Sequence, residues 1–104
     1  MKMLLIGLML LGLAAPVHSN DLCDAIGSAA ESSMSARQVG VSKSVLEEIM
    51  RDASTTRQER QIMQMMIDRA FETPRHSTES ARNSEARRFG LLWEAACHQL
   101  LRDQ

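Results

Sequence analysis

Three methionines in the stretch QIMQMM, at positions 63, 65 and 66, are the first residues whose type and spacing suggest chemistry. Thioether and imidazole groups that converge can bind Cu(I), because both suit a soft metal ion. On a helix Met63 and Met66 share a face, whereas Met65 points away, since each residue turns the chain by about 100°. Methionine also fills irregular hydrophobic cores, and we favour that interpretation. The alternative is a copper or other metal site formed by Met63 and Met66 with His76 or His98.

A second candidate for chemistry is His76, which follows Arg75 and has Glu72 and Glu79 nearby in sequence. An imidazole flanked by carboxylates can act as a general base or titrate near neutral pH, although a solvated loop residue has the same pattern. The chain contains no recognisable nucleophile motif, phosphate-binding glycine loop or metal-ligand signature. We therefore expect no enzyme activity and no cofactor.

The two cysteines, Cys23 and Cys97, stand near opposite ends of the chain. In an oxidising compartment two such cysteines normally form a disulfide, and only one intramolecular pairing is possible. A reactive thiol or a metal-binding pair is the alternative, but a redox motif would bring the two cysteines close in sequence. A disulfide between Cys23 and Cys97 is the favoured prediction.

The first 19 residues predict export. Lys2 precedes an apolar run over residues 3–15, and Val17 and Ser19 are small residues suited to cleavage after Ser19. The run is shorter than the roughly 20 apolar residues of a spanning helix. We expect a signal peptide over residues 1–19 and one helical domain over residues 20–104. The mature protein would be periplasmic or secreted and free of the membrane; a retained N-terminal anchor is the alternative.

Helix-forming residues dominate the rest of the chain, and strand signals are few. Ser44 to Glu47 and Thr56 to Glu59 both fit the capping box, in which a hydroxyl and a carboxylate satisfy the first backbone amides of a helix. Pro74 should end the preceding helix at Thr73. Four helices are predicted: residues 21–38, a short helix capped by Ser42 or Ser44, residues 57–73, and a helix from Ser77 or Thr78 to about residue 101. The apolar stripe of the last helix comprises Phe89, Trp93, Ala96, Cys97, Leu100 and Leu101.

The predicted disulfide makes the first and last helices antiparallel neighbours. Gly27, Ala30 and Gly90 are small and share the faces of the cysteines, so the two backbones can approach to the Cα separation of about 5–6 Å that a disulfide needs. The sequence therefore predicts an all-α fold, a small four-helix bundle closed by one disulfide between the first and last helices.

The surface charge is mixed. Twelve Lys and Arg stand against 13 Asp and Glu, so the chain has no basic footprint for nucleic acid or anionic membrane. In the last helix Glu85 is three residues from both Arg82 and Arg88, which suits ion pairs on a helix surface.

The chain resembles a group of short secreted proteins of unknown function from proteobacteria and their phages. The resemblance rests on the early Cys23, on ARQVGV (36–41), on AFETPRHST (70–78) and on a late aromatic-rich helix ending near Cys97. It covers most of the chain after the leader. It implies export and a pair of cysteines, and it implies no catalytic activity.

These observations predict a small secreted or periplasmic helical interaction protein, a binding, inhibitory or chaperone-like module for an unidentified protein of the cell envelope. Turns and loops carry recognition more often than the faces of a bundle. We therefore expect the contacts in the turn at residues 37–41 and the loop at residues 71–77. Their candidate side chains are Arg37, Gln38, Arg75 and His76; capping and local ion pairing are the alternative roles.

Overall fold

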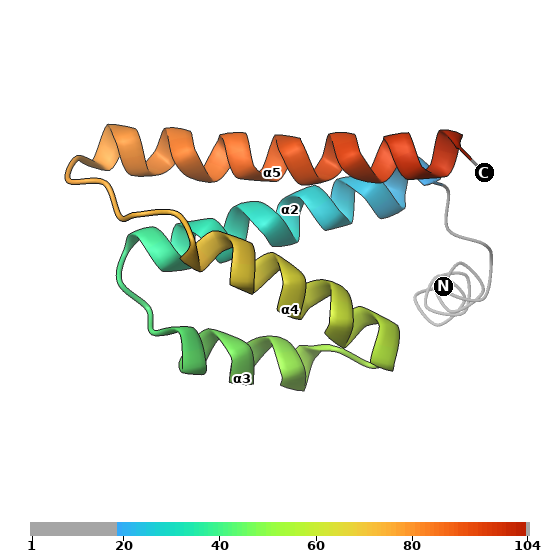
Figure 1. Cartoon of the computed structure of the whole chain (residues 1–104), viewed down its shortest axis with the longest axis horizontal. Coiled ribbons are helices and arrows are strands. Elements are labelled where there is room, and N and C mark those ends of the chain that lie inside the picture. The colour runs from blue at the N-terminus through green and yellow to red at the C-terminus, as the bar shows by residue number, and fades with distance from the viewer. Residues whose placement is uncertain (1–18, 104) are drawn as a thin grey trace, which may run out of the picture.

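The computed structural model describes residues 19–103, which form four helices and no strand (Figure 1). The helices are α2 (Ser19–Gln38), α3 (Lys43–Ala53), α4 (Arg57–Phe71) and α5 (Glu79–Arg102). The all-α prediction is confirmed, whereas the predicted signal peptide falls almost entirely outside the described residues. None of the four helices combines the length and the apolar character needed to cross a membrane.

Side-chain caps start α3, α4 and α5, and one predicted capping box is wrong. The Thr56 capping box is confirmed: its hydroxyl accepts from the Glu59 amide (3.0 Å), while the Glu59 carboxylate accepts from the Thr56 amide (3.2 Å). The cap of α3 is Ser42, and Ser44 lies inside that helix. Glu47 does not close a capping box, because its carboxylate accepts a hydrogen bond from Gln64 of α4 (2.8 Å).

Helix α4 ends two residues before the end that the sequence predicts. α4 ends at Phe71, and the amides of Glu72 and Thr73 bond three residues back, to the carbonyls of Arg69 (3.2 Å) and Ala70 (3.1 Å). This tightening two residues before the predicted end accords with the restriction that Pro74 places on the residue before it. Thr78 caps α5, as one of the two predicted alternatives.

The pairing of α2 with α5 is the most extensive contact of the fold, and the Cys23–Cys97 disulfide links the two helices with a Cα separation of 5.4 Å. The small residues permit this approach. A Cβ atom on Gly90 would lie 2.8 Å from the backbone oxygen of Gly27, closer than real Cβ contacts allow. The predicted disulfide and the predicted close approach of the two helices are therefore confirmed.

Methionines supply much of the hydrophobic core. Met34 and Met66 are fully buried, Met63 is half-buried against the core, and Met65 is 57 % exposed. The prediction that Met63 and Met66 share an inward face while Met65 points elsewhere is confirmed. The core cluster comprises Ala30, Met34, Met66, Ala70, Ala86 and Phe89.

The four helices form two pairs, α2 with α5 and α3 with α4, and the pairs meet where α4 packs on α2. Both connections between the pairs lie at the same end, which we call the closed end (residues 37–42 and 72–78). At the opposite end α4 diverges from α5, as Figure 1 shows. We call this the open end; it contains the disulfide, the start of α2, the start of α4 and the last turns of α5.

Candidate functional site

One glutamine holds the closed end together. The side chain of Gln38 is 1 % exposed, and its Nε2 donates to the backbone oxygen of Pro74 (3.0 Å) and to the sulfur of Met34 (3.6 Å). Its Oε1 accepts from the backbone amide of His76 (2.8 Å). The last residue of α2 therefore fixes the loop that joins α4 to α5.

Two arginines add hydrogen bonds between α2 and this loop, one from each of the two segments. Arg37 donates through Nε to the backbone oxygen of Thr73 (3.0 Å), and its guanidinium lies 4.9 Å from the centre of the Phe71 ring. Arg75 donates in return to the backbone oxygen of Gln38 (3.0 Å). Gly40, whose φ of +97° favours glycine, brings the turn against Arg75; an added Cβ would lie 3.3 Å from its Cζ.

A nearly buried carboxylate joins the loop to α5. Glu85 Oε1 lies 3.0 Å from His76 Nε2 and accepts from Arg88 Nη2 (2.7 Å). The hydrogen bond with His76 lowers the pKa of the Glu85 carboxyl, and Arg88 lowers it further against the opposing effect of burial. The predicted pairing of Glu85 with Arg88 is confirmed, but Arg82 donates to the backbone oxygen of His76 (3.1 Å) and does not pair with Glu85.

The free energy of unfolding is expected to fall in acid partly because of Glu85. Its pKa is lower in the folded state, so its stabilising contribution is complete above the ordinary value of 4.5 and is lost as the pH falls through the folded-state value. Urea unfolding between about pH 3 and pH 7 should show a shallower pH dependence for Glu85→Gln than for the wild type. Glu48→Gln, at an exposed position on α3, is the control. A Glu85→Gln slope equal to that of the wild type would contradict the assignment.

The structure brings together at the closed end all four residues that the sequence nominated for partner contact, and each of them takes part in hydrogen bonds within the chain. Arg37, Gln38, Arg75 and His76 each hydrogen-bond across the closed end. Gln38 is buried and cannot contact a partner, so its predicted role in binding is corrected to a structural one. Only Arg75 is largely exposed; Arg37 and His76 are half-buried.

The open end carries a different kind of surface, an apolar groove of about 330 Å³ between α2, α4 and α5. Leu22 is 45 % exposed, Met65 57 % and Leu100 66 %, so each of the three helices leaves a large apolar side chain uncovered. Apart from Gln58 and the disulfide-bonded Cys97, the lining consists of Leu22, Ile26, Ile62, Met65, Trp93, Ala96, Leu100 and Leu101.

A second apolar hollow adjoins this groove. It has a volume of about 280 Å³, lies between α2, the end of α3 and the start of α4, and shares Leu22, Ile26 and Ile62 with the groove. The apolar surface therefore continues across the start of α2. Helical periodicity predicted the apolar stripe of α5. It did not indicate that no other helix covers this stripe at Leu100.

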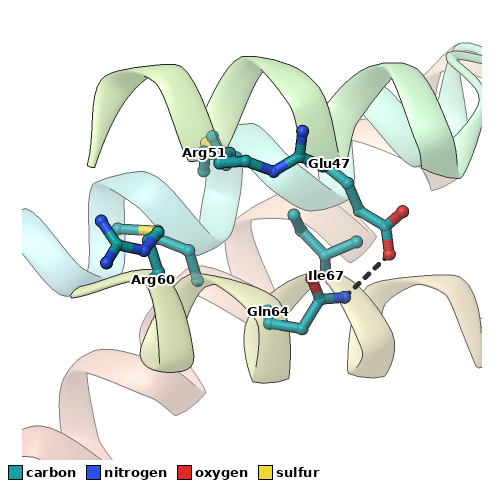
Figure 2. A pocket seen from close by; sticks show the side chains of 7 residues that line it. Glu47, Arg51, Arg60, Gln64 and Ile67 are labelled. Atoms are coloured by element: carbon teal, nitrogen blue, oxygen red, sulfur yellow. Dashed lines mark hydrogen bonds between the residues drawn. The ribbon is translucent and has the colours of Figure 1, made fainter. Parts of the chain in front are cut away.

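A third hollow, of about 290 Å³, lies between α3 and α4 and has a polar rim (Figure 2). Glu47 accepts from Gln64 (2.8 Å), and near the start of α3 Lys43 forms an ion pair with Asp68 (3.0 Å). These exposed contacts join α3 to α4, and exposed pairs of this type contribute little stability. Figure 2 shows Ile67 between α3 and α4, beside the hydrogen bond of Glu47 with Gln64, and this side chain is buried.

The two histidines of the copper alternative lie at opposite ends of the fold. Met66 is fully buried, His76 faces Glu85 at the closed end, and the Nε2 of His98 lies 3.8 Å from Glu94 at the open end. Glu85 and Glu94 are nine residues apart on α5, which is roughly 13 Å along the helix axis. The two histidines therefore cannot belong to one coordination sphere, and at most one of them could join Met63 and Met66.

Comparison of the chain with protein-family models, with curated proteins and with solved structures finds no match.

Proposed function

We propose that the protein is a small exported interaction protein that binds a helical segment of a partner in the cell envelope, in the groove between α2, α4 and α5. The observation that carries this proposal is the apolar lining of the groove, with Leu22, Met65 and Leu100 each about half exposed or more. Burial of apolar surface is the main driving force for association. The proposal includes no catalytic step and no cofactor.

The shape and chemistry of the groove favour a helix as the occupant. α4 and α5 both pack on α2 without extensive contact with each other, so the groove has two helical walls and a helical floor. The backbone of an incoming segment would find few polar partners there, with Gln58 as the one polar side chain of the lining. A helix satisfies its own backbone groups and can present an apolar stripe to such a groove.

Two features support the cellular setting. The disulfide indicates an oxidising environment, since such bonds persist outside the reducing cytosol. The leader-like residues 1–19 and the resemblance to short secreted proteins agree with export to the periplasm or beyond. We propose the periplasm or the extracellular space as the site of action.

The exposed part of the closed end is a second candidate contact surface for the same function. Arg75 remains largely exposed and His76 keeps 37 % of its side chain accessible. The internal hydrogen bonds of this end argue for the groove, because a partner would have to compete with them.

Site-specific photocrosslinking in the producing cells tests the proposal and separates the two surfaces. A benzophenone amino acid is placed at Met65 or Leu100 in the groove, at Arg75 on the closed end, or at the exposed control position Val45 on α3. We expect one protein to be crosslinked at Met65 and Leu100 and absent at Val45, with the crosslinked peptide lying in an amphipathic helix. Occupancy of the groove should also shift the fluorescence of Trp93, the only tryptophan.

The other outcomes are equally informative. Adducts confined to Arg75 would show that the partner binds at the closed end and not in the groove. Adducts between two copies of this chain would replace the partner helix by a homodimer. Equal labelling at all four positions, or none at any, would contradict the proposed interaction.

A further inference from the structure

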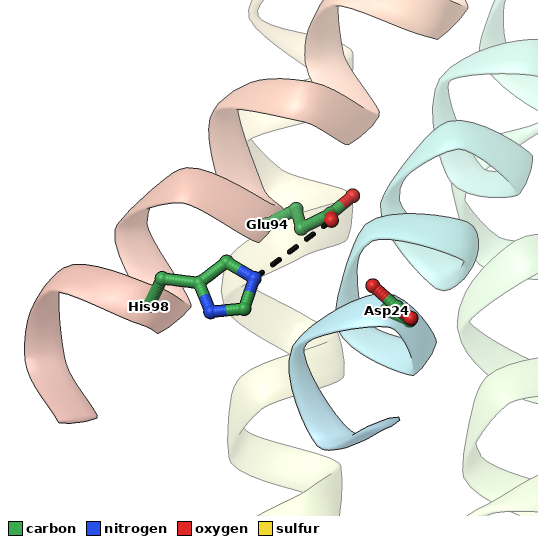
Figure 3. Close-up of side chains that lie close together, drawn as sticks. All are labelled: Asp24, Glu94 and His98. Atoms are coloured by element: carbon green, nitrogen blue, oxygen red, sulfur yellow. Dashed lines mark ion pairs between the residues drawn. The ribbon is translucent and has the colours of Figure 1, made fainter. Parts of the chain in front are cut away.

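Three metal-ligating side chains meet at the open end, between α2 and α5. Asp24, Glu94 and His98 each offer one ligand atom, and these atoms lie within 4.8 Å of one another (Figure 3). Two of the ligands, Glu94 and His98, are one turn apart on α5, and Figure 3 shows Asp24 facing them from α2. We propose that these three residues form a binding site for a divalent transition-metal ion, with Zn²⁺ as the best-suited probe.

The fold fixes the positions of the three ligands. Asp24 directly follows Cys23 and His98 directly follows Cys97, so the disulfide holds the two ligand-bearing turns next to each other. Gly27 provides the room for the third ligand: a Cβ atom there would lie 3.0 Å from both Cβ and Oε1 of Glu94. The site therefore does not depend on flexible loops, and covalent and packing constraints preorganise it.

The local charge favours a cation. Among the described residues, no Lys or Arg forms an ion pair with Asp24 or Glu94, and the only ion-pair partner of Glu94 is the imidazole of His98 (3.8 Å). Two carboxylates held within 4.8 Å of each other repel when both are ionised. A bound dication would remove this repulsion.

The ligand set indicates the class of ion. An imidazole with carboxylates suits zinc and neighbouring transition metals, whereas Ca²⁺ and Mg²⁺ take oxygen ligands in larger number. Tetrahedral zinc needs ligand atoms roughly 3.4 Å apart, which small side-chain rotations can provide here. The side chains of Glu94 and His98 are 33 % and 30 % exposed, so an ion can enter and water can complete its coordination.

Zinc binding at this position would add a second link between α2 and α5 beside the disulfide. A ligand that binds only the folded state raises the melting temperature in proportion to the logarithm of its concentration. The metal would thus stabilise the open end next to the groove, independently of whether the groove binds a partner.

Isothermal titration of zinc chloride into the oxidised protein, together with thermal unfolding at several zinc concentrations, tests the proposal. We expect binding of about one ion per chain and a melting temperature that rises with zinc. His98→Ala and Glu94→Gln should each weaken binding at least about tenfold, and Asp24→Asn should also weaken it. The matched controls Glu48→Gln and Asp52→Asn, both exposed on α3, should bind zinc as the wild type does.

Several results would contradict the proposed zinc site. Absence of both binding heat and a thermal shift at about millimolar zinc would do so, as would affinity that survives His98→Ala. Affinity abolished by His76→Ala, with His98→Ala unchanged, would place the ion at the closed end instead. The helical circular dichroism of each variant, measured without metal, shows that a lost affinity reflects a lost ligand and not unfolding.

Discussion

Replacing Cys23 and Cys97 together by alanine is expected to lower the free energy of unfolding by about 4–5 kcal/mol. The bond closes a sequence separation of 74 residues, and a loop of this length strongly restricts the unfolded chain. A helical domain of this size has a net stability of only about 5 kcal/mol, so the variant should be largely unfolded at 37 °C. Alanine is the suitable replacement because Cys23 is fully buried.

Urea unfolding followed by circular dichroism at 222 nm measures this loss. Reduction of the wild-type protein with dithiothreitol should reproduce it, whereas the same reductant should leave the double variant unchanged. The second comparison is the control for effects of the reductant itself. A double variant within about 1 kcal/mol of the wild type would show that packing at Gly27 and Gly90 holds α2 to α5 without the bond.

The fold was predictable wherever local chemistry determines it. Thr56 and Glu59 form their capping box within one turn, and the only two cysteines allow one pairing. Of the two predicted caps of α3, Ser42 is confirmed, but the capping box of Ser44 with Glu47 is wrong because Glu47 bonds Gln64 of α4, 17 residues away. Local sequence cannot reveal such a competitor from another helix.

The candidate sites were less predictable for the same reason. Helical periodicity placed Leu100 on the apolar stripe of α5, but whether a neighbouring helix covers that stripe depends on the angle at which α4 leaves α2. Asp24 and His98 come together because each follows a disulfide-bonded cysteine. Given the disulfide between Cys23 and Cys97, the sequence itself indicates that Asp24 and His98 lie close together. It contains no other indication of this cluster.

Gln38 shows that long-range contacts can give a residue a role that its place in the sequence does not indicate. From sequence it was an exposed polar side chain in a turn. In the structure its amide bonds Pro74 and His76, which are 36 and 38 residues away. It therefore links the end of α2 to the loop that joins α4 to α5.

Gln38→Met is expected to destabilise the protein by about 2–4 kcal/mol. Methionine preserves the length of the side chain, so the loss comes from the hydrogen bonds to Pro74 and His76 and not from a cavity. Each partly buried backbone group left without a partner costs about 1–3 kcal/mol. Gln61→Met, at an exposed position on α4, is the matched control and should change stability by less than about 0.5 kcal/mol.

Hydrogen exchange distinguishes this local role from general destabilisation. The amide of His76 donates to Gln38, so it should exchange much faster in Gln38→Met, while amides in the middle of α5 should exchange faster only in proportion to the loss of global stability. Unchanged protection at His76 would contradict the assignment. Because Gln38 lies at the closed end, a weaker response of Trp93 to a groove ligand in this variant would show that the polar closed end determines the geometry of the apolar open end.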